Sequence, residues 1–322
     1  MTTERAILDH RLLVVTGKGG TGKTTVVAAL AQAAAGRGRR VLVVETGRDE
    51  AVPRLLAPGS PPVGYEGREV QPGLTCMRVD PYAALSEYIG LQFGARVVAD
   101  TVLRNRAFRQ LMDAAPGWRE LITLGKIWHL EQAERAPGDP RWDLLLVDAP
   151  ATGHGITFLD VPRVVVSAVR AGPLRRHAGW VESMVRDPDA TLLLPVALAE
   201  ELPARETAEL VARLREQVGI AVDRVVVNAL TPPPLPDAVP DLVERLERLR
   251  PDAELGGLPA PPVLAACLRH ACARAELNRH YLGEIQRSTG LPAIALPELP
   301  GGIAGPADLE PLGRLLLQEP AS

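Results

Sequence analysis

Residues 17–24, with the sequence GKGGTGKT, form a glycine-rich segment that ends in a lysine and a hydroxyl residue. The segment matches the pattern G-x-x-x-x-G-K-S/T, in which backbone N–H groups surround the oxygens of a nucleotide phosphate. In this pattern Lys23 reaches the β- and γ-phosphates, and the hydroxyl of Thr24 binds Mg²⁺. The sequence therefore predicts a site for a nucleotide with its Mg²⁺. The residues expected to contact the nucleotide are Gly19, Gly20, Thr21, Gly22, Lys23, Thr24 and Thr25.

Lysine is rare in this chain, and its positions are informative. Lysine and arginine together number 36, but only Lys18, Lys23 and Lys126 are lysines. Because ammonium and guanidinium groups differ in shape and hydration, a retained lysine indicates a role that arginine does not fill. Lys18 and Lys23 both lie in the glycine-rich segment, which supports a phosphate-binding role for that segment.

A carboxylate follows another apolar run. Asp148 comes directly after residues 144–147, which read LLLV. A charged side chain in that position needs a partner, and a bound cation is one. We expect Asp148 to lie beside the glycine-rich segment and to hold Mg²⁺ through water, although capping of the next turn is the alternative. Gly153 and Gly155 then allow the backbone to approach a γ-phosphate, so that this loop could switch between ATP and ADP.

The elements that must position these residues alternate along the chain. Short runs that are apolar on both faces predict buried strands, and longer periodic segments predict helices. This alternation predicts a doubly wound α/β fold, with a mostly parallel sheet and helices on both faces. We interpret residues 1–322 as one domain with a helical subregion at about 83–135, broken near residues 116–117. The expected strands are 12–15, 41–44, 74–79, 144–147, 191–198, 222–227 and 293–296, and the other expected helices are 25–35, 203–218 and 306–318.

The order K-G-G-x-G-K-S/T at residues 18–24 resembles the deviant Walker A ATPases. These include the MinD, ParA, nitrogenase iron-protein and anion-pump families. The resemblance implies that Lys18 reaches across a dimer interface to the nucleotide of the partner subunit. A positive charge supplied in this way stabilises the transferring phosphoryl group. The alternative for Lys18 is a solvated charge on a loop.

Further segments narrow the resemblance to the ArsA-like family, which contains the arsenite-pump and tail-anchored-protein-targeting ATPases. Residues 147–154, VDAPATGH, look like the D-x-A-P-x-x-G-H segment of that family, and residues 116–120, PGWRE, resemble its P-G-x-x-E stretch. Asn228 matches its adenine-reading asparagine, although a turn residue is the other interpretation. Residues 296–305, which include Pro297, resemble its terminal adenine-contact loop. The resemblance spans nearly the whole chain and implies a dimeric ATPase that uses ATP and Mg²⁺.

The chain departs from this family after its second strand. The family reads S-T-D-P there, and the aspartate orients the attacking water, whereas residues 45–48 read ETGR. Gly47 therefore takes the catalytic position without a side chain. Glu45 or Asp49 could replace the aspartate after a loop shift, because a carboxylate must lie within hydrogen-bond reach of that water. The expected catalytic residues are thus Lys18, Lys23 and Asp148, with Glu45 or Asp49.

Two regions associated with zinc and cargo in this family also differ. The spacing of Cys267, His270 and Cys272 is not one that is standard for zinc ligands. Residues five apart on a helix also point to different faces. We therefore interpret the two cysteines as buried or inert. Residues 156–190 are a short client or partner segment with one methionine and five arginines. A transmembrane cargo needs a longer apolar groove, so we interpret this segment as a polar or anion-binding interface, or as a solvated helix face.

Composition excludes other classes of function. With a net charge of −3, no strong basic balance indicates nucleic acid as the partner, and no apolar run is long enough to cross a membrane. The three scattered cysteines and the absence of a signal segment favour the cytoplasm. We predict an ATPase switch that couples nucleotide state to an unknown protein cargo or membrane partner, as a homodimer or a heterodimer. The alternative is a regulatory or scaffold subunit that binds nucleotide, hydrolyses little and pairs with an active relative.

Overall fold

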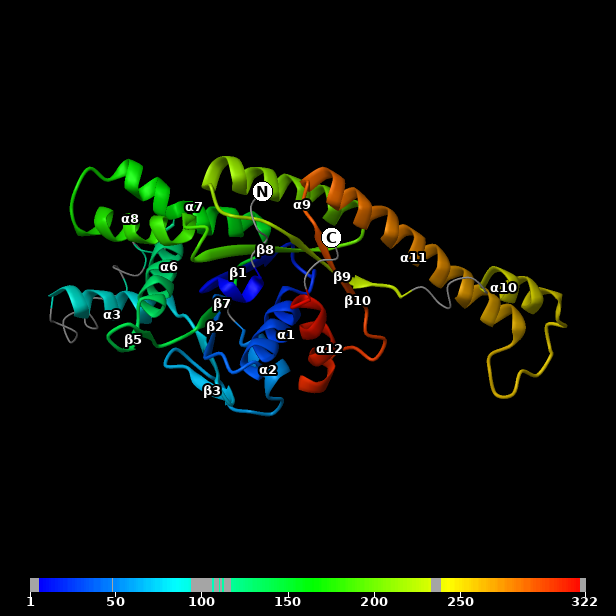
Figure 1. Ribbon diagram of the computed structural model, residues 1–322. Coiled ribbons are helices and arrows are strands. Elements are labelled where there is room, and N and C mark those ends of the chain that lie inside the picture. Colours follow the sequence, from blue (N-terminus) through cyan, green and yellow to red (C-terminus); the bar gives the residue numbers. More distant parts are fainter. Residues whose placement is uncertain are drawn as a thin grey trace.

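The central element of the protein is a β-sheet in the middle of the computed structural model (Figure 1). The structure describes residues 6–47, 49–93, 106, 110, 112, 117–232 and 239–318. Within them the main sheet has eight strands, in the order β10-β9-β8-β1-β7-β2-β4-β3. The strands are β1 (Leu12–Gly17), β2 (Val41–Glu45), β3 (Arg68–Gln71), β4 (Leu74–Arg78), β7 (Leu144–Asp148), β8 (Thr191–Leu198), β9 (Val225–Leu230) and β10 (Ala293–Pro297).

The sheet brings the predicted chemistry to one edge. Neighbouring strands pair in parallel, except that β3 is antiparallel to β4. Val15 of β1 lies opposite Asp148 of β7, and Glu45 of β2 lies opposite Asp148 on the other side. Because parallel strands end at the same edge, the segments after β1, β2 and β7 meet there. The strand pattern thus positions the glycine-rich segment, Gly47 and Asp148 close together.

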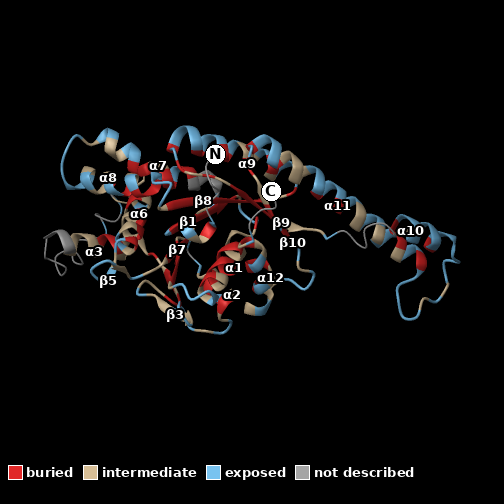
Figure 2. Ribbon diagram, in the orientation of Figure 1, coloured by how far each residue is buried: buried red, intermediate tan, exposed pale blue. Residues whose placement is uncertain are grey.

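Helices cover both faces of the sheet, which confirms the doubly wound α/β fold (Figure 1). Alternate residues of β2 face opposite cores: Val41 and Val43 pack with α1, and Leu42 and Val44 pack on the other face. Figure 2 shows the inner strands of the main sheet as buried, whereas β3 at its edge is partly exposed. Each buried Val or Leu side chain contributes roughly 1.5–3 kcal/mol. The first face is covered by α1 (Lys23–Gly36), α2 (Ala51–Leu56) and α12 (Pro306–Leu316), and the second by α6 (Trp118–Glu131), α7 (Thr152–Ala168), α8 (Pro173–Arg186) and α9 (Glu201–Arg213).

Three of the remaining helices extend toward the two ends of the molecule (Figure 1). The helix α11 (Pro261–Thr289) runs from the sheet far beyond it, and α10 (Val239–Arg248) packs beside its outer part (Figure 1). At the opposite end, α3 (Pro81–Phe93) packs against α6. The short elements are a 3₁₀ turn (Ile7–Asp9), a π-helical turn (Leu214–Val218) and a hairpin of β5 (Glu134–Ala136) and β6 (Asp139–Pro140).

Several boundaries differ from those expected. The helical subregion begins at Pro81, its last described helix ends at Glu131, and strand β5 replaces helix at residues 134–135. Pro116 and most residues between 94 and 116 lie outside the described part of the chain. Strand β9 begins at Val225 rather than residue 222, because Val222 is buried in the core without joining the sheet. The long α11 was not expected, since few of its residues are buried and its apolar periodicity is weak.

Candidate nucleotide site

The glycine-rich segment connects β1 to α1 in a turn that depends on glycine. The backbone angle φ is +151° at Gly17 and +87° at Gly22. Residues with a side chain rarely adopt these values. A Cβ atom on Gly17 would lie 2.2 Å from the carbonyl oxygen of Val196, and one on Gly22 would lie 2.1 Å from Nδ2 of Asn228. Strand β8 and Asn228 therefore pack directly on the backbone of the loop. A larger residue at either position would displace the loop from the sheet edge.

Hydrogen bonds within the loop bring the predicted residues together. Nζ of Lys23 and Oγ1 of Thr21 each donate to the carbonyl oxygen of Lys18, both at 3.0 Å. Nδ2 of Asn228 donates to the carbonyl oxygen of Thr21 at 3.0 Å. Burial lowers the pKa of Lys23, and the nearby carboxylate of Asp148 opposes that shift. The ammonium group of Lys23 thus lies in a partly desolvated position, where its attraction for a phosphate is stronger than in water.

Thr24 and Asp148 provide the oxygen atoms expected of a magnesium site. Oγ1 of Thr24 donates to Oδ2 of Asp148 at 2.8 Å, and Oγ1 of Thr46 donates to the carbonyl oxygen of Asp148 at 2.7 Å. Burial raises the pKa of Asp148, while the hydrogen bond from Thr24 and the charge of Lys23 lower it. Mg²⁺ prefers a hydroxyl, a carboxylate and substrate phosphates as ligands. The residues present therefore fit a magnesium ion bound together with a nucleotide.

Glu45 lies beside Asp148 but caps a helix. Its Oε1 atom accepts hydrogen bonds from the backbone N–H groups of Ala51 and Val52, at 2.7 and 2.8 Å, at the start of α2. Its Oε2 atom is buried without a hydrogen-bond partner. Burial raises the pKa of Glu45 to about 7, and the charges of Asp148 and Glu50 add to the shift. The carboxylate of Glu45 is therefore engaged in hydrogen bonds that hold the start of α2. Asp49, in contrast, is exposed and borders a cavity lined by Glu50, Arg54 and Arg78.

The raised pKa of Glu45 predicts how stability depends on pH. The unfolded chain releases this proton near pH 4.5 and the folded chain near pH 7, so the folded state binds more protons in that window and loses stability as pH rises through it. Glu45→Gln keeps the acceptor atom for α2 and removes the titration. At pH 8 we expect the variant to be more stable than the wild type by up to about 3 kcal/mol. Urea denaturation without nucleotide or Mg²⁺ measures this difference, and an equal difference at pH 5 and pH 8 would contradict it.

Gly47 borders a polar cavity of about 320 Å³ at the same edge of the sheet. A Cβ atom added to Gly47 would meet nothing within 4 Å, so the position has room for a side chain. The cavity is also lined by Asp80 and Glu120, at the starts of α3 and α6. Oδ1 of Asp80 accepts a hydrogen bond from the backbone of Ala83 at 2.8 Å and so caps α3. The space that a switch carboxylate would occupy is therefore open in this chain.

Lys18 has a partner within its own chain, which the sequence did not indicate. Its Nζ atom lies 2.6 Å from Oε1 of Glu206 on α9, 188 residues away. The two side chains are 41% and 31% exposed, so water screens the pair. The second carboxylate oxygen of Glu206 is buried without a hydrogen-bond partner. No local pattern connects residues so far apart, and only the placement of α9 after β8 brings them together.

Other predicted residues lie farther from this centre. Gly153 lies in the first turn of α7, so the expected loop at 153–155 is the start of a helix. A helix N-terminus still favours an anion. Pro297 ends β10, where it pairs with Leu230 of β9. In the segment 156–190, Arg163 and Arg186 pair with acidic residues one turn away, Asp160 and Glu182, and Arg175 bonds to backbone carbonyl groups before α8.

The cysteines and histidine of α11 do not form a cluster. Cys267 is exposed and Cys272 is partly exposed, so the structure does not bury them, whereas Cys76 is buried in the sheet. Within the described ranges, no three His, Cys, Asp or Glu residues gather in a way that could hold a metal ion. The same part of the chain has no helix with the length and apolarity required to span a membrane.

The chain is similar to known ATPases over much of its length. The profile of a family described as anion-transporting ATPase matches residues 10–179. The chain is 30% identical to the ATPase BagA of Mycobacterium tuberculosis over 316 residues, which cover 91% of this chain and 88% of BagA. It is 26% identical to the ATPase GET3 of Kluyveromyces lactis over 257 residues, or 69% of this chain and 72% of that protein. It is 25% identical to GET3 of Eremothecium gossypii over 256 residues, with the same coverage.

Proposed function

This chain belongs to the anion-transporting ATPase family, and we propose that it is an ATP- and Mg²⁺-dependent ATPase that acts as a dimeric switch. The observation that carries the proposal is the convergence of Lys23, Thr24 and Asp148 at one edge of the sheet. A desolvated ammonium group and a hydroxyl–carboxylate pair are the groups that a nucleotide phosphate and its Mg²⁺ require. We further propose that the chain forms one ATPase domain and works in the cytoplasm, without nucleic acid.

In the proposed reaction each residue has one task. The loop at Gly19–Thr25 would hold the phosphates through its backbone N–H groups, and Lys23 would neutralise the β- and γ-phosphates. Thr24 and Asp148 would hold Mg²⁺, which supplies positive charge to the phosphoryl oxygens when bound. Asn228, which already contacts Thr21, would border the base, with Pro297 farther along the same side. Water would then attack the γ-phosphorus, the bond from that phosphorus to the oxygen bridging to the β-phosphate would break, and ADP, phosphate and the proton lost by the water would be released.

The proposed switch depends on Lys18 and on the first turn of α7. Lys18 would leave Glu206 and enter the site of a partner subunit, where its charge stabilises the transferring phosphoryl group. Gly153, in the first turn of α7, would respond to the loss of the γ-phosphate. Each site would then need two subunits for turnover, and phosphate release would favour their separation. The nucleotide state would in this way control the binding of a protein cargo or a membrane partner.

Steady-state phosphate release with Mg-ATP, measured over a range of protein concentrations, tests the proposal. If two subunits complete each site, turnover per subunit rises with protein concentration and then reaches a plateau. A rate per subunit that does not change over a thousandfold range would contradict the dimeric switch. Absence of ATP binding, measured by calorimetry on the same sample, would contradict the nucleotide site itself.

A second candidate function is favoured by one observation, the glycine at position 47. Without a carboxylate there, a nucleotide-binding regulatory or scaffold subunit would hydrolyse little ATP and would pair with an active relative. Tight ATP binding without turnover at any protein concentration is the result expected of this function. Co-purification of a second ATPase of the same family would then support the heterodimer.

Removing the ion pair between Lys18 and Glu206 should strengthen ATP-dependent dimerisation. Glu206→Gln frees Lys18, and an exposed pair of this kind contributes about 0.2–1 kcal/mol, so we expect ATP-dependent dimerisation to strengthen about threefold. Analytical ultracentrifugation with Mg²⁺ and a non-hydrolysable ATP analogue measures the change. Glu209→Gln on the same helix is the matched control, because Glu209 pairs with the exposed Arg205 at 3.9 Å instead of with Lys18. Weaker dimerisation in Glu206→Gln would show that Glu206 assists Lys18 instead of restraining it.

A further inference from the structure

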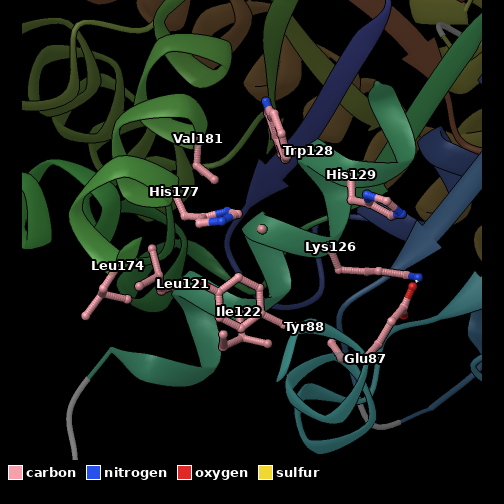
Figure 3. Close-up of a pocket in the computed structure, with 12 residues that line it drawn as sticks. Glu87, Tyr88, Leu121, Ile122, Lys126, Trp128, His129, Leu174, His177 and Val181 are labelled. Atoms are coloured by element: carbon pink, nitrogen blue, oxygen red, sulfur yellow. Dashed lines mark hydrogen bonds and ion pairs between the residues drawn. The ribbon is translucent and has the colours of Figure 1, made fainter. Parts of the chain in front are cut away.

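A further cavity, away from the nucleotide site, lies between α3, α6 and α8 (Figure 3). It has a volume of about 90 Å³ and an open side. Leu121, Ile122, Leu174 and Val181 form apolar walls around it. Figure 3 shows His177 directed from α8 toward α6, while Lys126 and Glu87 meet at the opposite side. The cavity thus has an apolar body with polar groups confined to its edges, as small-molecule sites commonly do.

Gly125 keeps this cavity open. It lies inside α6, where glycine is less favourable than alanine, and it lines the cavity. A Cβ atom on Gly125 would meet nothing within 4 Å, so close packing against a neighbour does not require glycine there. A side chain at this position would instead project into the cavity. The residue that weakens the helix is the one that leaves the space free.

The two oppositely charged side chains that line the cavity, Lys126 and Glu87, form an ion pair. Lys126 is the one lysine outside the glycine-rich segment at residues 17–24, which we call the phosphate loop. Its Nζ atom lies 2.6 Å from Oε2 of Glu87, and the two side chains are only 12% and 22% exposed. The ammonium group also lies 5.0 Å from the ring centre of Tyr65, whose hydroxyl donates to Glu87. Burial lowers the pKa of His177, as does the charge of Arg176. Arg176 is exposed and does not line the cavity, and within the lining the ammonium group of Lys126 is matched by the carboxylate of Glu87.

Aromatic rings make up much of the wall. The ring of His177 lies edge-on to Tyr88 with centres 4.9 Å apart, and edge-on to Trp180 at 4.7 Å. Trp128, which also lines the cavity, stacks on Trp180 at 5.1 Å. Rings in these positions offer both faces and edges to a further ring. An enclosed cavity of roughly 150 Å³ holds benzene. The space here is smaller, so it admits at most one six-membered ring, part of which would extend into the open side.

We propose that the cavity between α3, α6 and α8 is a binding site for a small, uncharged molecule with one aromatic ring. The ring would lie against Trp128, Tyr88 and His177, next to Gly125, and any polar substituent would point through the open side. This site is independent of the proposed ATPase function, because no residue of the phosphate loop contributes to it. A charged ligand would lose its hydration without gaining an unpaired opposite charge, so the site should discriminate against ions.

Three probes with the same ring test the proposal: benzyl alcohol, benzoate and benzylamine, which at pH 7 are neutral, negative and positive. Saturation-transfer NMR and the fluorescence of the tryptophans follow their binding to the full-length protein without nucleotide. We expect benzyl alcohol to bind with a Kd of about 1 mM, as suits so small a ligand, and the two ions at least about 10-fold more weakly. Equal binding of the three probes, or no saturation by benzyl alcohol, would overturn the proposal.

Gly125→Leu should abolish binding of benzyl alcohol, because the new side chain fills the cavity. Gly283→Leu is the matched control: Gly283 also lies inside a helix, α11, where a Cβ atom would meet nothing within 4 Å, and it is not part of the cavity wall. If Gly125→Leu does not fold, Gly125→Ala, which adds one methyl group, should still weaken binding severalfold. Unchanged binding in the Gly125 variants would overturn the site. ATP binding by the same samples reports separately on the nucleotide site.

Discussion

Lys23→Ala should abolish the binding of ATP. The ammonium group of Lys23 lies within the phosphate loop, partly desolvated and held by the carbonyl oxygen of Lys18 at 3.0 Å. Removing a buried charge from a phosphate contact costs about 3 kcal/mol or more, which is roughly a 100-fold loss of affinity. Isothermal titration calorimetry with Mg-ATP measures the loss. The glycine conformations of the loop do not depend on this side chain, so the fold should persist in the variant.

Lys18→Ala is the control that separates binding from turnover. Lys18 belongs to the same loop, but its side chain pairs with Glu206, whereas Lys23 donates to the backbone carbonyl oxygen of Lys18, which the substitution keeps. We therefore expect this variant to bind ATP within about threefold of the wild type and to lose ATP-dependent dimerisation and phosphate release. Equal loss of affinity in both variants would contradict the distinct roles proposed for the two lysines.

Gly47→Asp should accelerate phosphate release. Gly47 borders the polar cavity at the edge of the sheet, and a Cβ atom there would meet nothing within 4 Å. An aspartate can thus be added without a clash, at the position where the family carries its water-orienting carboxylate. A positioned general base contributes about 100-fold or more to a rate, so we expect an increase of at least about 10-fold at saturating Mg-ATP. Phosphate release at a fixed protein concentration above the plateau measures the change.

Gly47→Asn has nearly the same shape without the negative charge, and it should leave the rate unchanged. A gain in both variants would mean that the side chain orders the segment instead of orienting water. An unchanged rate in Gly47→Asp would indicate that another carboxylate already performs this task. Glu45 is engaged at the start of α2 by two hydrogen bonds, so Asp49 would then be the residue to replace.

Local patterns in the sequence determined the fold class and the centre of the site. The apolar runs are buried on both faces because they lie in a covered parallel sheet, and such runs are visible in any short window. The phosphate loop and Asp148 were equally predictable, since each directly follows one of these strands and parallel strands end at a common edge. The tertiary structure was not needed to predict that Thr24 and Asp148 would lie close together.

The tertiary structure decided the contacts between distant segments. The pairing of Lys18 with Glu206, the contact of Asn228 with Thr21 and the commitment of Glu45 to α2 depend on how helices and strands pack. The cavity beside Gly125 likewise exists only where three helices meet. Sequence periodicity reports which side of an element is buried, but it does not report which distant residue lies opposite. That choice is made by packing and by side-chain hydrogen bonds, which join residues that no local pattern connects.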